Sequence, residues 1–170
     1  MCRGSSPTRV VMRILGIDPG YDRCGIAIVE GSGSRQIVVM SDCILPPRGA
    51  QEDRLAYVAQ SVEEAIETYR PDALAIETLF FSVNKKTAIG VAEARGAVLA
   101  AAGHANVRII EFSPQQVKIA VTGHGRADKA AVARMIPRII ALTEKKRFDD
   151  EIDAIAIAIT AIVSSPSIGR

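Results

Sequence analysis

Three apolar runs in this chain adjoin carboxylates, and this arrangement limits how the chain can fold. Residues 12–17 lead into Asp18, residues 73–76 lead into Glu77, and residues 154–159 follow Asp150 and Asp153. Buried strands and helices rarely carry charges without a partner or a function. Acids at the ends of three separate elements therefore predict that these elements meet at one site. Grouped carboxylates are ligands with which proteins hold Mg²⁺ for phosphoryl chemistry.

The spacing of apolar residues predicts the order βββαβαβααα. Strands are expected at 12–18, 24–30, 35–45, 73–77 and 107–112, and helices at 50–69, 87–102, 114–121, 129–142 and 150–163. Short connections make the first three strands an antiparallel meander. The uniform apolarity of 73–76 is typical of a central parallel strand. Pro137 is expected to kink or divide its helix. The fold class is α/β, with a five-stranded mixed sheet flanked by helices.

The length of 170 residues fits one domain. We expect this domain at 12–165, with an N-terminal extension at 1–11 and a C-terminal tail at 166–170. No apolar stretch is long enough to span a membrane, and the first residues lack the apolar region of a secretory signal. The cysteines number 3 and show no Cys-x-x-Cys spacing, so neither a disulfide framework nor a zinc site is indicated. A reducing cytoplasm is the expected compartment.

Positive charge is concentrated in the middle of the chain. Residues 84–147 carry 12 Lys and Arg against 4 Asp and Glu, whereas the segments before and after them are net negative. Lysines and arginines often do no more than solvate exposed helix faces. Their distribution here favours a polyanionic substrate that is brought to metal-binding acids.

The expected topology predicts which acids lie together. A right-handed crossover through the first helix places the fourth strand beside the first, and this brings Glu77 next to Asp18. Asp150 and Asp153 share a helix face because they are three residues apart. Helix capping alone would account for Asp150, but it does not account for Asp153 against the apolar run. Two metal ions about 4 Å apart can clamp the oxygens of a phosphoryl displacement, and Asp18 is the expected bridging ligand.

Several stretches resemble, in order, the RuvC family of Holliday-junction resolvases. They are Ile14-Leu15-Gly16-Ile17-Asp18-Pro19-Gly20 followed by Gly25, and then 75–80, 115–118, 127–129 and 150–158. An Asp-x-Gly turn alone is a weak signal, because ribonuclease-H-like folds and sugar kinases share it. The ordered set is specific, and the resemblance extends over residues 12–163.

The resemblance implies a ribonuclease-H-like fold and a Mg²⁺-dependent endonuclease that acts as a homodimer on four-way junction DNA during recombination and repair. It implies two Mg²⁺ ions per site, for which Mn²⁺ can substitute, and the RuvA–RuvB branch-migration complex as a further partner. By motif position, the catalytic and metal-binding residues are Asp18, Glu77, Asp150 and Asp153, and the DNA-binding residues are Phe80, Lys118 and Lys129. Packing on the core is an equal alternative for Phe80, since aromatic side chains are often buried.

Residues 88–100 are rich in Ala and Gly, which permits the close approach of a partner helix and makes them a candidate dimer interface. Packing on the sheet is the alternative. A two-fold dimer presents two identical sites to a junction that has approximate two-fold symmetry. Other functions compete with junction cleavage: a nuclease of the same fold acting on RNA or on a hybrid, and a non-catalytic junction-binding dimer. A sugar-kinase-like ATPase half would require a later glycine-rich phosphate loop, which this sequence lacks.

Overall fold

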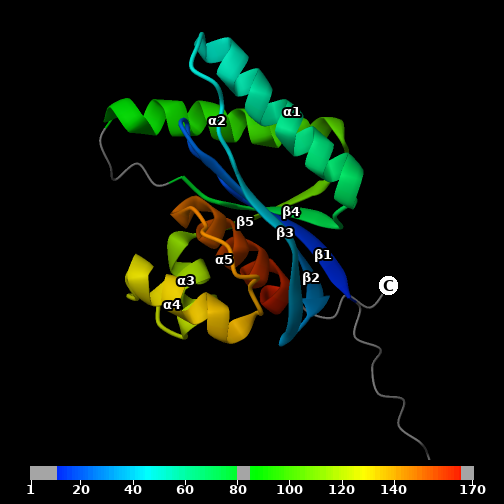
Figure 1. Cartoon of the computed structure of the whole chain (residues 1–170), viewed down its shortest axis with the longest axis vertical. Coiled ribbons are helices and arrows are strands. Elements are labelled where there is room, and N and C mark those ends of the chain that lie inside the picture. The colour runs from blue at the N-terminus through cyan, green and yellow to red at the C-terminus, as the bar shows by residue number, and fades with distance from the viewer. Residues whose placement is uncertain (1–10, 80–84, 166–170) are drawn as a thin grey trace, which may run out of the picture.

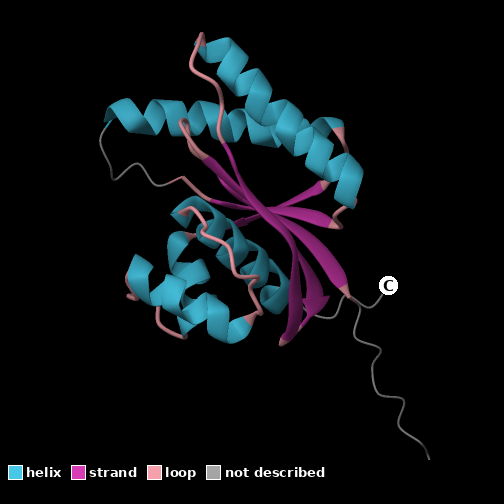
Figure 2. Ribbon diagram, viewed as in Figure 1, coloured by secondary structure: helices cyan, strands magenta, loops and turns pink. Residues whose placement is uncertain are grey.

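The computed structural model describes residues 11–79 and 85–165, which form a five-stranded mixed sheet between two layers of helices (Figure 1, Figure 2). The strands are β1 (Met12–Asp18), β2 (Cys24–Ser32), β3 (Arg35–Ile44), β4 (Ala73–Glu77) and β5 (Arg108–Phe112). The helices are α1 (Gln51–Tyr69), α2 (Lys85–His104), α3 (Pro114–Thr122), α4 (Lys129–Ile139) and α5 (Asp149–Ser164). The predicted fold class and element order are confirmed.

The strands are arranged in the order β3-β2-β1-β4-β5. The first three form the antiparallel meander that their short connections predict, whereas β4 pairs parallel to β1 and β5 pairs parallel to β4. β4 is buried from Ala73 to Ile76, because helices cover both faces of this central strand. The crossover through α1 therefore returns the chain to the side of β1, as predicted.

The two faces of the sheet have separate cores. α1 and α2 cover one face, and α5 covers the other with α3 and α4 beyond it (Figure 1). In β1, Leu15 and Ile17 pack toward α1 and α2, whereas Ile14 packs toward α5. Every residue from Ala154 to Ile162 is buried, since α5 lies between the sheet and other helices. The apolarity of α5 reflects this burial, and within residues 11–79 and 85–165 no helix could cross a bilayer.

The helix at 129–142 differs from its prediction. α4 runs unbroken from Lys129 through Pro137 and ends at Ile139, so Pro137 does not divide it. Pro137 lies in the last turn, where one missing N–H removes little helical bonding, and the N–H of Ile140 still bonds the carbonyl of Ile136. α2 is longer than predicted, because it starts at Lys85 and continues through Gly103 to His104.

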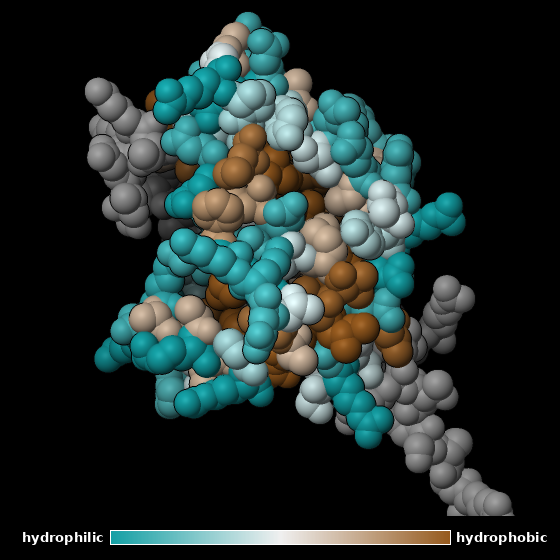
Figure 3. Space-filling model, in the orientation of Figure 1, coloured by the Kyte–Doolittle hydropathy of each residue, from teal (hydrophilic) through white to brown (hydrophobic). Residues whose placement is uncertain are grey.

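β3 forms one edge of the sheet and exposes the apolar side chains of Ile37 and Val39. Figure 3 shows apolar surface across the middle of the face that β3 crosses in Figure 1. Val39 is left out of the pairing with β2, because the register shifts between Ile28 and Val29. Such a bulge interrupts the row of backbone groups to which another strand could add.

Candidate active site

Two of the predicted acids lie side by side at the carboxyl ends of two neighbouring strands in the interior of the sheet. Asp18 is the last residue of β1, and Glu77 is the last residue of β4. The parallel pairing of these strands sets Ile17 opposite Ile76, so the two acids follow directly on neighbouring strands. Their relative position is fixed by backbone hydrogen bonds of the sheet, which are less mobile than side-chain contacts.

The other two acids reach these strand ends because α5 lies unusually close to β1 and β2. A Cβ atom at Gly16 would lie 2.2 Å from the carbonyl oxygen of Ala154, and one at Gly25 would lie 1.9 Å from that of Asp150. Only glycine permits such an approach between backbones. Gly16 and Gly25 thereby bring the first turns of α5 onto the strand ends.

Three of the acids and both predicted lysines line one pocket of about 220 Å³. Asp18, Glu77 and Asp153 come from β1, β4 and α5, and Lys118 and Lys129 come from α3 and α4. The rest of the lining is apolar: Pro114, Val117, Val132, Ala156 and Ile157. The Nζ atom of Lys129 lies 2.6 Å from Oδ2 of Asp153. The structure thus brings five of the seven predicted site residues together, while their roles stay predictions.

Asp150 lies beside this pocket and does not line it. Its Oδ2 atom is 3.3 Å from Nε of Arg23, which follows β1 in the loop after Asp18. The guanidinium of Arg23 also lies 5.7 Å from the ring centre of Phe148, the residue before α5. The contact between Arg23 and Asp150 is an ion pair without a hydrogen bond, so the buried Oδ2 lacks a hydrogen-bond partner in the described part of the chain. The sequence prediction did not include Arg23.

The pocket carries more negative than positive charge. Burial raises the pKa of Asp18 to about 7, and repulsion from Asp153 and Glu77 contributes further. The pKa of Glu77 is raised mainly by burial and secondly by the negative charge of Asp153, although both lysines oppose this shift. The pKa of Asp153 is raised mainly by burial, despite its hydrogen bond with Lys129. A cation added between these groups would favour the ionised form of all three.

The donor atoms fit a hard divalent cation, since carboxylate oxygens suit Mg²⁺ and Mn²⁺ better than they suit soft metals. As the side chains stand, no group of three or more His, Cys, Asp or Glu in the described residues is arranged to hold an ion. Two of the acids face cations of the protein instead, since Lys129 pairs with Asp153 and Arg23 faces Asp150. The unbonded buried oxygen of Asp150 remains an acceptor that a cation could satisfy.

The remaining predicted residue, Phe80, lies outside the described residues. Gly16 and Gly25 were recognised in the sequence only as parts of a motif, although a glycine inside a strand is a recognised signal of close backbone approach. Arg23 offered no such signal, because an arginine in a turn is ordinarily solvated.

The chain is similar to known proteins over most of its length. The family model described as crossover junction endodeoxyribonuclease RuvC matches residues 14–161. A protein of that name from Moorella thermoacetica is 44% identical over 151 residues, which cover 87% of this chain and 89% of the relative. Another, from Mycolicibacterium vanbaalenii, is 40% identical over 161 residues, which cover 94% of this chain and 83% of the relative.

Among solved structures, Thermus thermophilus RuvC in complex with Holliday junction substrate is similar with a TM-score of 0.81 and 36% sequence identity. The similarity covers 88% of this chain and 92% of that chain. The fold is therefore ribonuclease-H-like, and the family resemblance predicted from the sequence motifs is confirmed.

Proposed function

Because the chain belongs to the RuvC family of crossover junction endodeoxyribonucleases, we propose that it resolves four-way DNA junctions by paired nicks during recombination and repair. The reaction is the hydrolysis of phosphodiester bonds. We assign it to the pocket at the ends of β1 and β4, with Mg²⁺ as the cofactor and Mn²⁺ as a substitute.

The observation that supports this proposal best is the meeting of acids and lysines around one pocket. Asp18, Glu77 and Asp153 face the same space as Lys118 and Lys129. A phosphodiester is an anion, so acids alone would repel it, whereas lysines beside the acids attract it. The combination suits a phosphoryl substrate better than a neutral one.

We propose that Asp18, Glu77, Asp150 and Asp153 hold two Mg²⁺ ions, with Asp18 shared because it lies centrally. Bound Mg²⁺ would supply Lewis acidity at the attacking and leaving oxygens of an in-line displacement. Lys118 and Lys129 position the phosphate by charge and hydrogen bonding. Lys129, whose exposed ammonium group lies 2.6 Å from Asp153, would exchange this contact for a DNA phosphate when a metal ion neutralises that acid.

We further propose that the active form is a homodimer in which α2 contributes to the interface. A junction must be cut on two opposed strands, and a two-fold dimer presents one site to each. Contacts to phosphates dominate the affinity for DNA, so binding weakens steeply as the salt concentration rises. Shape and deformability of the junction distinguish it from linear duplex.

The expected setting is the cytoplasm, where the RuvA–RuvB branch-migration complex would be a partner. A pull-down of that complex on junction DNA, with and without this chain, tests the partnership. Recovery of this chain together with the RuvA–RuvB complex, in an amount that depends on the junction DNA, supports the partnership.

The function is tested by incubating the protein with a synthetic four-way junction, a linear duplex and an RNA–DNA hybrid of matched sequence, each with Mg²⁺ and each with EDTA. We expect symmetric nicks on the junction in Mg²⁺, with 5′-phosphate and 3′-hydroxyl ends that ligase can seal. Preferential cutting of the hybrid would overturn the proposal. Junction binding without cutting of any substrate would indicate a non-catalytic binding protein instead.

A further inference from the structure

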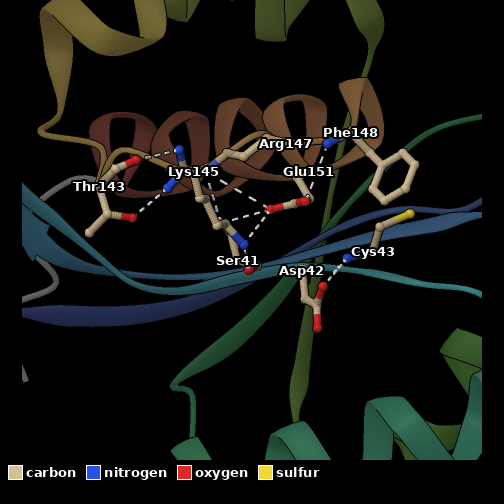
Figure 4. Close-up of polar contacts among 8 residues, drawn as sticks. All are labelled: Ser41, Asp42, Cys43, Thr143, Lys145, Arg147, Phe148 and Glu151. Carbon is tan, nitrogen blue, oxygen red and sulfur yellow. Dashed lines mark hydrogen bonds and ion pairs between the residues drawn. The ribbon is translucent and has the colours of Figure 1, made fainter.

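Glu151 is a buried acid that faces away from the pocket. It lies in the first turn of α5, immediately after Asp150 and two residues before Asp153, and its residue surface is only 2% exposed. Figure 4 shows its carboxylate pointing toward Ser41 of β3, with Lys145 and Arg147 beside it. A carboxylate in such a position destabilises the fold unless hydrogen bonds and cations compensate for its lost hydration.

Both oxygens of Glu151 have partners. Oε1 accepts a hydrogen bond of 3.3 Å from the backbone N–H of Phe148. Oε2 accepts one of 3.1 Å from the hydroxyl of Ser41, and lies 2.9 Å from Nζ of Lys145. Nε of Arg147 is 3.9 Å from the same oxygen. The carboxylate therefore joins β3, the segment before α5 and the first turn of α5.

The segment before α5 is tied to β3 by the same cluster (Figure 4). Lys145 donates a hydrogen bond of 2.6 Å to the carbonyl oxygen of Ser41, and Arg147 donates one of 3.3 Å to its hydroxyl. The guanidinium of Arg147 also bonds the carbonyl and the hydroxyl of Thr143, at 2.8 and 2.9 Å. The path of the chain into α5 is thus fixed relative to the edge strand.

The start of α5 lacks a side-chain cap on its N-cap residue. Phe148 is the residue at the N-cap and its side chain has no oxygen to accept the free N–H groups of the first turn, whereas Glu151 accepts the backbone N–H of Phe148 itself. On the other side, α5 packs against the backbone at Gly16 and Gly25. Its acids Asp150 and Asp153 face Arg23 and Lys129. The bonds of Glu151 add the restraint on the side of β3, so the direction in which Asp150 and Asp153 project depends on them in part.

We infer that Glu151 is a positioning residue, which through Ser41, Lys145 and Phe148 fixes the first turn of α5 and with it the metal-binding acids. It acts through Asp150 and Asp153 and touches neither metal nor DNA. The inference rests on the proposed function of the pocket. Substitution of residues that orient metal ligands without contacting the ion commonly lowers metal affinity by about 10- to 100-fold.

The test measures Mn²⁺ binding to DNA-free protein by electron paramagnetic resonance, well below the melting temperature of each variant. Glu151→Gln is expected to raise the Kd for Mn²⁺ about tenfold. Ser41→Ala, which removes the hydroxyl's bonds with Glu151 and Arg147 and spares the charges, is expected to raise it less. The double variant should raise the Kd by less than the sum of the two single effects, because the bond between Ser41 and Glu151 is common to both changes.

Thr160→Val is the matched control. Thr160 is buried in the same helix, but its hydroxyl bonds only the carbonyl of Ala156 within α5, at 2.8 Å. This variant should lower the melting temperature and leave Mn²⁺ affinity unchanged. The inference is overturned if Glu151→Gln and Ser41→Ala lower the melting temperature while binding Mn²⁺ like the wild type.

Junction cleavage by the same variants separates this inference from the proposed function. If the wild type cuts junctions and Glu151→Gln requires more Mg²⁺ for half-maximal rate, both stand. If the wild type cuts no junction but Mn²⁺ binding still weakens in Glu151→Gln, the positioning role stands and the proposed function fails.

Discussion

The acids of the pocket fall into two pairs that are held in different ways. Asp18 and Glu77 end neighbouring parallel strands, so the sheet fixes their positions. Within residues 11–79 and 85–165, neither of these two forms a salt bridge. Asp150 and Asp153 project from a helix turn, and each faces a cation, Arg23 in one case and Lys129 in the other.

The strand pair therefore has a fixed position without an ion pair within the described residues, and the helix pair has ion pairs without a position fixed by the sheet. In the strand pair, the pKa of Asp18 is raised to about 7 as a result of burial and of the neighbouring acids. The helix pair is compensated, but its position depends on how α5 meets the sheet. Changes at the strand pair should therefore affect chemistry with little loss of stability, whereas changes where α5 meets the sheet should affect both.

Asp18→Asn breaks the strand pair and should have the largest effect. Removing the central carboxylate is expected to slow junction cutting by about a thousandfold or more, which corresponds to about 4 kcal/mol in the activation free energy. Junction binding measured in Ca²⁺ by gel shift should persist, because lysines and not acids attract the phosphates.

The control for this variant is Asp53→Asn, which removes an exposed acid from α1. Its cutting rate should equal that of the wild type. Loss of junction binding together with cutting in Asp18→Asn would mean that the acid supports the fold instead of the reaction.

Gly25→Ala tests the contact between α5 and the sheet. A Cβ atom at this position would lie 1.9 Å from the carbonyl oxygen of Asp150, so α5 must move away from β2. We expect a loss of about 3 kcal/mol in the free energy of unfolding, typical of overpacking, together with slower cutting. Thermal unfolding and junction cleavage measure the two effects.

Gly103→Ala in α2 is the corresponding control, because its added Cβ meets no atom within 4 Å. It should retain both stability and cutting. If Gly25→Ala were as stable and active as this control, α5 would not be held by the close contact at Gly25.

Much of this arrangement followed from the sequence. The sequence predicted that Asp18 lies beside Glu77, because the right-handed crossover rule sets which strands are neighbours and both acids end such strands. The contact between Lys129 and Asp153 did not follow, since it depends on how α4 packs over α5. Burial of Glu151 was also missed, because an acid within Asp149-Asp150-Glu151 is typical of a solvated helix start. Its partner Ser41 is 110 residues away, and local patterns contain no information on such pairs.

The pH dependence of the free energy of unfolding, measured in EDTA, should reveal the raised pKa of Asp18 in the strand pair. The pKa of Asp18 rises from 3.8 to about 7 on folding, mainly through burial, so the folded state binds this proton more tightly than the unfolded state. The resulting stability is complete below about pH 4 and is lost as the pH rises through 7. Asp18→Asn cannot lose a proton there.

Differential scanning calorimetry of both proteins, compared at each pH, isolates the contribution of Asp18. Above pH 7 the variant should be more stable than the wild type by on the order of 4 kcal/mol, and Mg²⁺ should reverse the difference. An equal melting temperature for the two proteins across this range would show that Asp18 is not under electrostatic strain.

Lys129→Met removes the cation that faces Asp153 of the helix pair and should have the smallest effect on junction cutting. Lys129 opposes the raised pKa values of Asp18, Glu77 and Asp153, which are themselves caused mainly by burial. Without Lys129, these acids ionise at higher pH, so the acid limb of the cutting rate should move to higher pH. The exposed Lys146 lies on the segment before α5, outside the pocket, and Lys146→Met should leave the profile in place. A slower rate with no shift would assign Lys129 to phosphate positioning alone, whereas a shift shows that it also sets the charge state of the acids.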